Sequence, residues 1–163
     1  MIKLIFLLVL FIPLVSCSSE VEKHLEGTWT FQYILDSKGD LEPYLYSDVI
    51  GFRLDKNCVL PEHRGSELVS KDNKGIWNIK EITPKEYELT IESTNVAFKG
   101  TYKVKFYYDK IKEDLYVTLE KPDLNILAIK WSYSSPTTAK FISDHTDPTT
   151  DLGEIYKDLP IKY

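Results

Sequence analysis

Residues that carry most protein chemistry are scarce in this chain of 163 residues, which holds two cysteines and three histidines. The histidines, His24, His63 and His145, lie in three separate segments without the spacing of metal ligands. The sequence has no Gly-X-Ser-X-Gly elbow, no phosphate-cradling glycine loop and no prominent pair of carboxylates. We therefore expect no catalytic residue, no metal site and no cofactor, and we predict that the protein is not an enzyme.

An excess of basic residues is also missing, since the formal net charge is −5 at pH 7. Lysines and acidic residues alternate along the chain, so no positive stripe forms that could follow a phosphate backbone. This pattern excludes nucleic acid as an expected partner. The acidic balance indicates solubility more than it indicates any particular ligand.

Long apolar runs are absent apart from one, Leu4 to Val15, which follows the positive charge of Lys3. The run is too short to span a bilayer comfortably, and the small residue Ser16 ends it. Residues 1–16 are therefore predicted to be a cleaved signal peptide. An ordinary secretory signal and a lipoprotein signal both fit this layout.

The tetrapeptide Leu14-Val15-Ser16-Cys17 resembles the lipobox of bacterial lipoproteins. The resemblance implies that the Cys17 sulfur carries a diacylglyceryl group and that acyl chains hold the protein at a membrane outside the cytoplasm. By the same resemblance, Ser18 favours the outer membrane. Residues 17–23 would then be a short polar tether. With Cys17 acylated, Cys58 has no partner, so we expect a free, mostly buried thiol and no disulfide.

From residue 24 onward, apolar and polar residues alternate with the period of a half-buried strand, and compact turns separate the runs. Such a pattern predicts an all-β domain over residues 24–133, an antiparallel meander that closes into a small barrel, with a β-sandwich as the alternative. The expected strands lie near residues 28–35, 50–54, 77–79, 87–92, 102–108, 115–120 and 125–133.

Three segments break the alternation. Residues 42–46 and 61–71 are expected to form loops over one mouth of the barrel, with a single helical turn. Residues 134–163 form an irregular C-terminal extension that could pack on the barrel. Within it, Phe141 and Ile142 suggest a short strand, and residues 151–159 suggest a brief helix or an extended arm.

The motif Gly27-Thr28-Trp29 at the start of the first strand resembles the Gly-X-Trp signature of lipocalins and lipocalin-like domains. This resemblance implies that Trp29 plugs the closed end of the barrel. The chain lacks the Thr-Asp-Tyr motif and the last-strand arginine of larger lipocalins. Lys130, on the last strand, is the candidate to replace that arginine as a cation over Trp29.

The inner face of the sheet is the remaining candidate site, and its predicted members are Trp29, Phe31, Tyr33, Trp77, Tyr102 and Phe106. One interpretation is an apolar pocket for a small hydrophobic ligand or a lipid, in which tyrosine hydroxyls orient the ligand. The other is that these rings fill the barrel. In the second case, the protein would be an envelope module that presents its loops to a protein or glycan partner.

Overall fold

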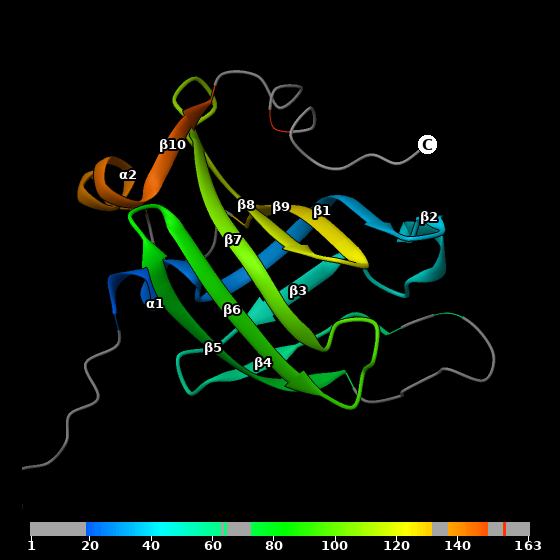
Figure 1. The fold of residues 1–163 in the computed structure, drawn as a ribbon. Coiled ribbons are helices and arrows are strands. Elements are labelled where there is room, and N and C mark those ends of the chain that lie inside the picture. The colour runs from blue at the N-terminus through cyan, green and yellow to red at the C-terminus, as the bar shows by residue number, and fades with distance from the viewer. Residues whose placement is uncertain (1–18, 63, 65–72, 132–136, 150–154, 156–163) are drawn as a thin grey trace, which may run out of the picture.

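The computed structural model describes residues 19–62, 64, 73–131, 137–149 and 155 (Figure 1). Its centre is a closed, antiparallel, eight-stranded β-barrel, which confirms the predicted lipocalin-like barrel over the β-sandwich. Each strand pairs with the next along the chain, and the last pairs with the first. The barrel strands are β1 Gly27–Asp36, β3 Val49–Phe52, β4 Asn57–Val59, β5 Lys74–Thr83, β6 Glu86–Ser93, β7 Gly100–Asp109, β8 Asp114–Lys121 and β9 Leu124–Lys130.

Strand β1 closes the barrel because both of its edges are paired. Its first half pairs with β3, where Gly27 lies opposite Phe52. Most of its length pairs with β9, from Trp29 opposite Lys130 to Asp36 opposite Leu124. Closure leaves these strands without a free edge, which removes a site for edge-to-edge aggregation.

The short strand β4 is an element that the alternation pattern does not predict. Only three residues long, it places Cys58 in the core, directly opposite Gly75 of β5. A side chain at Gly75 would bring its Cβ to 2.9 Å from the Cys58 sulfur and 2.9 Å from the Glu92 carbonyl oxygen. Glycine is therefore required where β4, β5 and β6 meet.

Helix α1, Glu20–Leu25, precedes the barrel and covers one of its ends. A capping box starts the helix: the Ser19 hydroxyl accepts from the Glu22 N–H, and the Glu22 carboxylate accepts from the Ser19 N–H. Val21 and Leu25 are buried in the barrel core. The prediction of a tether through residue 23 is corrected here, because residues 20–23 belong to α1.

Residues 137–149 of the C-terminal extension pack on the same end of the barrel as α1 (Figure 1). Helix α2, Ala139–His145, begins at Thr138, whose hydroxyl accepts from the Phe141 N–H at 3.1 Å. Strand β10, Thr146–Thr149, then pairs in parallel with the end of β7. The predicted strand at Phe141 and Ile142 is wrong, because a capped helix places the Phe141 ring in the core. Of the arm predicted over residues 151–159, only Ile155 lies within the described residues.

The opposite end carries β2, Gly39–Asp40, and the 3₁₀ helix η1, Glu42–Tyr44. The latter confirms the helical turn expected in residues 42–46. We call the two ends the α1 end and the β2 end, and they lie on the left and right of Figure 1. The turns β3–β4, β5–β6 and β7–β8 lie at the α1 end. In the described part of the chain, no helix has the length and apolarity needed to cross a membrane.

Candidate functional site

Five of the six predicted interior residues belong to one continuous core. Trp29, Phe31, Trp77, Tyr102 and Phe106 are all buried in a core to which every barrel strand contributes, β4 through Cys58 and the others through aliphatic side chains. The aromatic rings contact one another at angles typical of protein cores, such as Phe106 tilted 48° against Trp29. The predicted inward direction of these five side chains is therefore confirmed.

The sixth residue, Tyr33, does not point into the barrel, so this part of the prediction is wrong. The pairing of β1 with β9 shifts register between Phe31 and Tyr33, which marks a β-bulge. A bulge inserts one residue and reverses the faces beyond it. Ile34 therefore enters the core, while Tyr33 packs outside the barrel in a second cluster that contains Tyr116, Leu127 and Ile155.

Trp29 plugs the α1 end, as the Gly-X-Trp resemblance implies. Gly27 adopts a φ of +122°, which an L side chain rarely tolerates, and this conformation leads the chain from α1 into β1. The indole N–H of Trp29 donates to the Leu25 carbonyl oxygen at 2.8 Å. The Lys130 ammonium lies 5.6 Å from the centroid of the Trp29 ring, which confirms the predicted cation–π partner.

Lys130 also fixes α1, because its Nζ donates to the His24 carbonyl oxygen at 2.6 Å. Burial lowers the pKa of Lys130 to about 8, against a smaller opposing effect from the carboxylate of Glu26. The lysine is thus a structural link between β9 and α1. Its position opposite Trp29 in the β1–β9 register explains why this strand end requires a long cation.

The polar groups of the other interior aromatics are also satisfied within the protein. The Trp77 indole N–H donates to the carbonyl oxygens of Arg53 at 2.9 Å and Asn57 at 3.1 Å. The Tyr102 hydroxyl donates to the Phe98 carbonyl oxygen at 2.6 Å, and burial raises the pKa of this phenol. Of the two predicted tyrosines, Tyr102 therefore has its hydroxyl bonded to the backbone, and Tyr33 lies outside the barrel.

Side chains close both ends of the barrel. At the β2 end, Phe98 is fully buried and stacks on Phe31 with ring centroids 6.3 Å apart. Beside it, the Asn95 amide donates to the Pro61 carbonyl oxygen at 3.0 Å. At the α1 end, Phe141 stacks in parallel on His24, with ring centroids 3.8 Å apart.

His24 and His145 lie together at the α1 end, although they are far apart in sequence. His24 Nδ1 donates to the Glu20 carbonyl oxygen at 2.9 Å, and its Nε2 accepts from the Thr138 N–H at 3.4 Å. Burial lowers the pKa of His24. His145 Nδ1 hydrogen-bonds the Tyr87 hydroxyl at 2.6 Å. The two histidines thus join α1, α2 and β6, and His63 lies outside the described residues.

The thiol of Cys58 is free and buried, as predicted, and burial raises its pKa to about 11. A thiol with such a pKa is a poor nucleophile at neutral pH. Cys17, the predicted lipidation site, lies outside the described residues. Within the described ranges, no group of three or more histidine, cysteine, aspartate or glutamate side chains is arranged to hold a metal ion.

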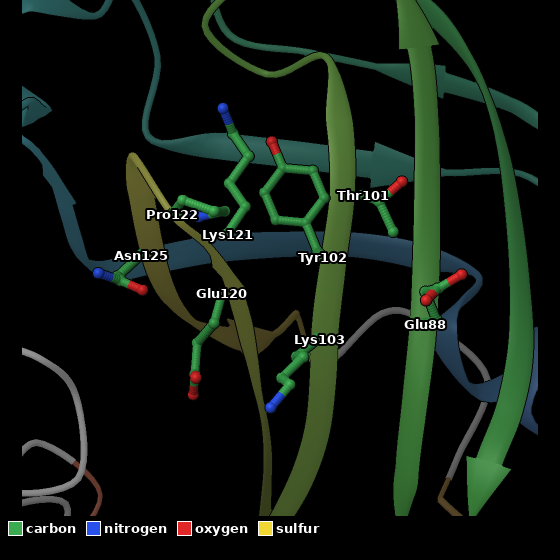
Figure 2. A pocket seen from close by; sticks show the side chains of 8 residues that line it. All are labelled: Glu88, Thr101, Tyr102, Lys103, Glu120, Lys121, Pro122 and Asn125. Atoms are coloured by element: carbon green, nitrogen blue, oxygen red, sulfur yellow. The ribbon is translucent and has the colours of Figure 1, made fainter.

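A hollow of about 330 Å³ lies on the outer wall across β6 to β9 (Figure 2). Its wall carries charges of alternating sign, with Lys103 between Glu88 and Glu120 in the strand register. In Figure 2, Lys103 and Glu120 point one way, and Tyr102 and Lys121 point the other. The Lys121 ammonium pairs with Asp123 at 2.7 Å. Such a row is typical of a solvated sheet face.

At the β2 end, the two segments predicted to be loops meet. The Arg64 N–H donates to the Tyr44 carbonyl oxygen at 2.5 Å, and the Tyr46 N–H donates to the Glu62 carbonyl oxygen at 2.8 Å. The Arg64 guanidinium lies 5.5 Å from the centroid of the exposed Tyr46 ring. We call Tyr44, Tyr46 and Arg64 the tyrosine loop. Sequence reasoning identified both segments but could not pair them, since the contact depends on the fold.

The fold and its interior define a lipocalin-like β-barrel whose described core is filled by its own aromatic and aliphatic side chains. Comparison with protein-family models, with curated proteins and with solved structures found no match.

Proposed function

We propose that the protein is a lipid-anchored module of the cell envelope that binds a partner through its surface and carries no ligand in its barrel. The observation that supports this function best is the state of the interior aromatics. The side chains of Trp29, Trp77 and Tyr102 each donate a hydrogen bond to a backbone carbonyl oxygen of the protein itself. A ligand would have to break these bonds and displace a packed core.

The tyrosine loop is the surface that we propose for the partner. Tyrosine and arginine are enriched where proteins bind one another, because they offer a large, rigid and amphipathic contact area. Exposed tyrosine faces also suit the apolar faces of sugar rings, so the partner is an envelope protein or glycan. The loop lies at the β2 end, away from α1 (Figure 1).

Site-specific photocrosslinking in the native envelope tests the partner hypothesis. A photoreactive residue at Tyr46, which is 64% exposed, should give a discrete crosslinked species. Ile76 is the matched control, since it is 57% exposed but lies on the barrel wall in β5. Equal crosslinking from both positions would contradict a specific partner at the tyrosine loop.

The carrier hypothesis is tested separately by native mass spectrometry of the protein after exposure to mixed lipids. We expect no retained hydrophobic molecule. A lipid retained at one molecule per protein would overturn the filled-barrel proposal, since Trp29 and Phe106 leave no exposed interior face for it. The anchor itself is tested by metabolic labelling with radioactive palmitate, which Cys17→Ala should abolish.

A further inference from the structure

Exposed aliphatic side chains mark the turns at the α1 end. Leu54 lies in the β3–β4 turn, Ile82 at the end of β5 beside the β5–β6 turn, and Ile111 in the β7–β8 turn. Each is exposed, and Ile111 reaches 77%. These three side chains, which we call the aliphatic tips, come from separate hairpins on one side of the barrel (Figure 1).

Basic residues accompany the aliphatic tips. Arg53 precedes Leu54, and Lys110 and Lys112 flank Ile111. A hollow of about 280 Å³ at this end is lined by Lys85, Lys110 and the hydroxyls of α2 and β10. An apolar side chain beside a cation matches the boundary between acyl chains and phosphate headgroups.

Several of the other charges at the α1 end are paired within the protein. Glu22 pairs with Lys56 at 2.5 Å, and Lys140 of α2 pairs with Asp144 at 2.5 Å and lies 3.5 Å from Glu20. Asp147 pairs with Lys85 at 3.2 Å. Asp55 and Glu81, which adjoin Leu54 and Ile82 in the sequence, still add negative charge beside the aliphatic tips.

The proposed anchor lies close in sequence to the α1 end, which favours the membrane as the surface that the aliphatic tips contact. Cys17 precedes Ser19 by two residues, which span at most about 7 Å when fully extended. Helix α1 begins at Ser19 and covers the same end of the barrel as the tips. An acylated Cys17 would therefore hold this end within a few ångströms of the headgroups.

We propose that the α1 end of the barrel lies on the phospholipid surface, with Leu54, Ile82 and Ile111 inserted among the headgroups. The inference rests on the proposed lipid anchor at Cys17. It orients the whole module: the tyrosine loop at the β2 end points away from the bilayer, toward a partner. Aliphatic insertion contributes most of the contact, and the flanking cations contribute less because acidic neighbours offset them.

Tryptophan fluorescence tests this orientation. The full-length lipidated protein is reconstituted in vesicles of phosphatidylethanolamine and phosphatidylglycerol that contain brominated phosphatidylcholine, which quenches tryptophan on contact. The reporters are Ile111→Trp and, in a second variant, Leu54→Trp. Val96→Trp is the matched control, since Val96 is 60% exposed but lies in the β6–β7 loop at the β2 end. The signal of the unmodified protein, which includes Trp131, is subtracted.

We expect the added tryptophan at either tip to be quenched on the order of twofold more than the control, because interfacial side chains lie about 5–10 Å into the headgroup boundary. Equal quenching of Ile111→Trp, Leu54→Trp and Val96→Trp in vesicle-bound protein would overturn the orientation and leave the anchor intact. Protein that does not stay with the vesicles would overturn the anchor and this inference together.

Discussion

The two ends of the barrel are closed by different means. At the α1 end, two helices cover the opening and are joined by ionisable side chains, since His24 bonds the backbone of both helices and His145 bonds Tyr87. At the β2 end, loops cover the opening with Phe98 and Asn95, and neither of these side chains titrates. The closure of the α1 end therefore includes a histidine, His24, whose pKa is lowered by burial, whereas Phe98 and Asn95 carry no ionisable group.

The surfaces of the two ends differ as well. The α1 end exposes three aliphatic residues at turn tips and Trp131 after β9. The β2 end exposes Val96 and two tyrosines, one of which carries a stacked arginine. Aliphatic tips suit a fluid lipid surface, and rigid aromatic rings suit a defined partner. This difference supports a module with one end at the membrane and the other at its partner.

The largest expected effect tests whether α2 is part of the closed barrel. Phe141→Ala removes a fully buried ring that contacts His24 and Phe106, and should lower the free energy of unfolding by about 3–5 kcal/mol. Ile142→Ala, next to it on α2 and only half-buried, should cost about 1 kcal/mol. Urea denaturation measures both. Equal, small effects would mean that α2 is a dispensable cover.

The next prediction concerns the packing of the barrel wall between the two ends, where β4, β5 and β6 meet. Gly75→Ala places a Cβ at 2.9 Å from the Cys58 sulfur and a backbone oxygen, so it should destabilise the protein by about 1–3 kcal/mol. Gly51→Ala is the control, because its nearest neighbour would lie 3.8 Å away. That variant should be neutral or more stable by about 0.5 kcal/mol. Similar unfolding midpoints for the two variants would contradict tight packing at β4.

The pH response of the α1 end is expected to be smaller. Burial is the main cause that lowers the pKa of His24 below 6.5, and the charges of Lys130 and His145 add to it while Glu20 opposes it. The unfolded chain therefore takes up a proton first as the pH falls. The contribution of neutral His24 to the free energy of unfolding is fully present above about pH 6.5. This contribution is lost as the pH falls through the lower pKa of the folded state.

Replacing the histidine isolates this contribution. His24→Gln should flatten the dependence of the unfolding free energy on pH between about pH 7 and about pH 5, where most carboxylates stay ionised. The measurement is a series of urea titrations across that range. If the unfolding free energies of the wild type and His24→Gln change in parallel with pH, protonation of His24 does not contribute to the pH dependence of stability.

Much of the barrel could be predicted because the alternation of apolar and polar residues in each strand shows which side chains face the core. In β6, Tyr87, Leu89 and Ile91 alternate with charged or polar residues, and all three enter the core. The strand faces need only the period of the sheet. Lys130 could be placed over Trp29 because the resemblance to lipocalins implies a last-strand cation over the first-strand tryptophan.

Other features depend on contacts that no local pattern contains. The bulge that turns Tyr33 outward arises from the register between β1 and β9. Strand β4 is too short for alternation to detect. Helices α1 and α2 span six and seven residues, too few for a periodic signal, although the Ser19–Glu22 capping box is visible in the sequence. The packing of Phe141 on His24 joins residues more than a hundred positions apart.

The smallest expected effect on stability is at the tyrosine loop, and it tests the division of roles between the ends. Tyr46→Ala removes an exposed ring and one exposed cation–π contact, so the unfolding free energy should change by no more than about 0.5 kcal/mol. The same variant should abolish crosslinking of a photoreactive residue placed at Tyr44. Loss of stability without loss of the crosslink would reverse the assignment of Tyr46: its ring would be a structural part of the β2 end and not a contact for the partner.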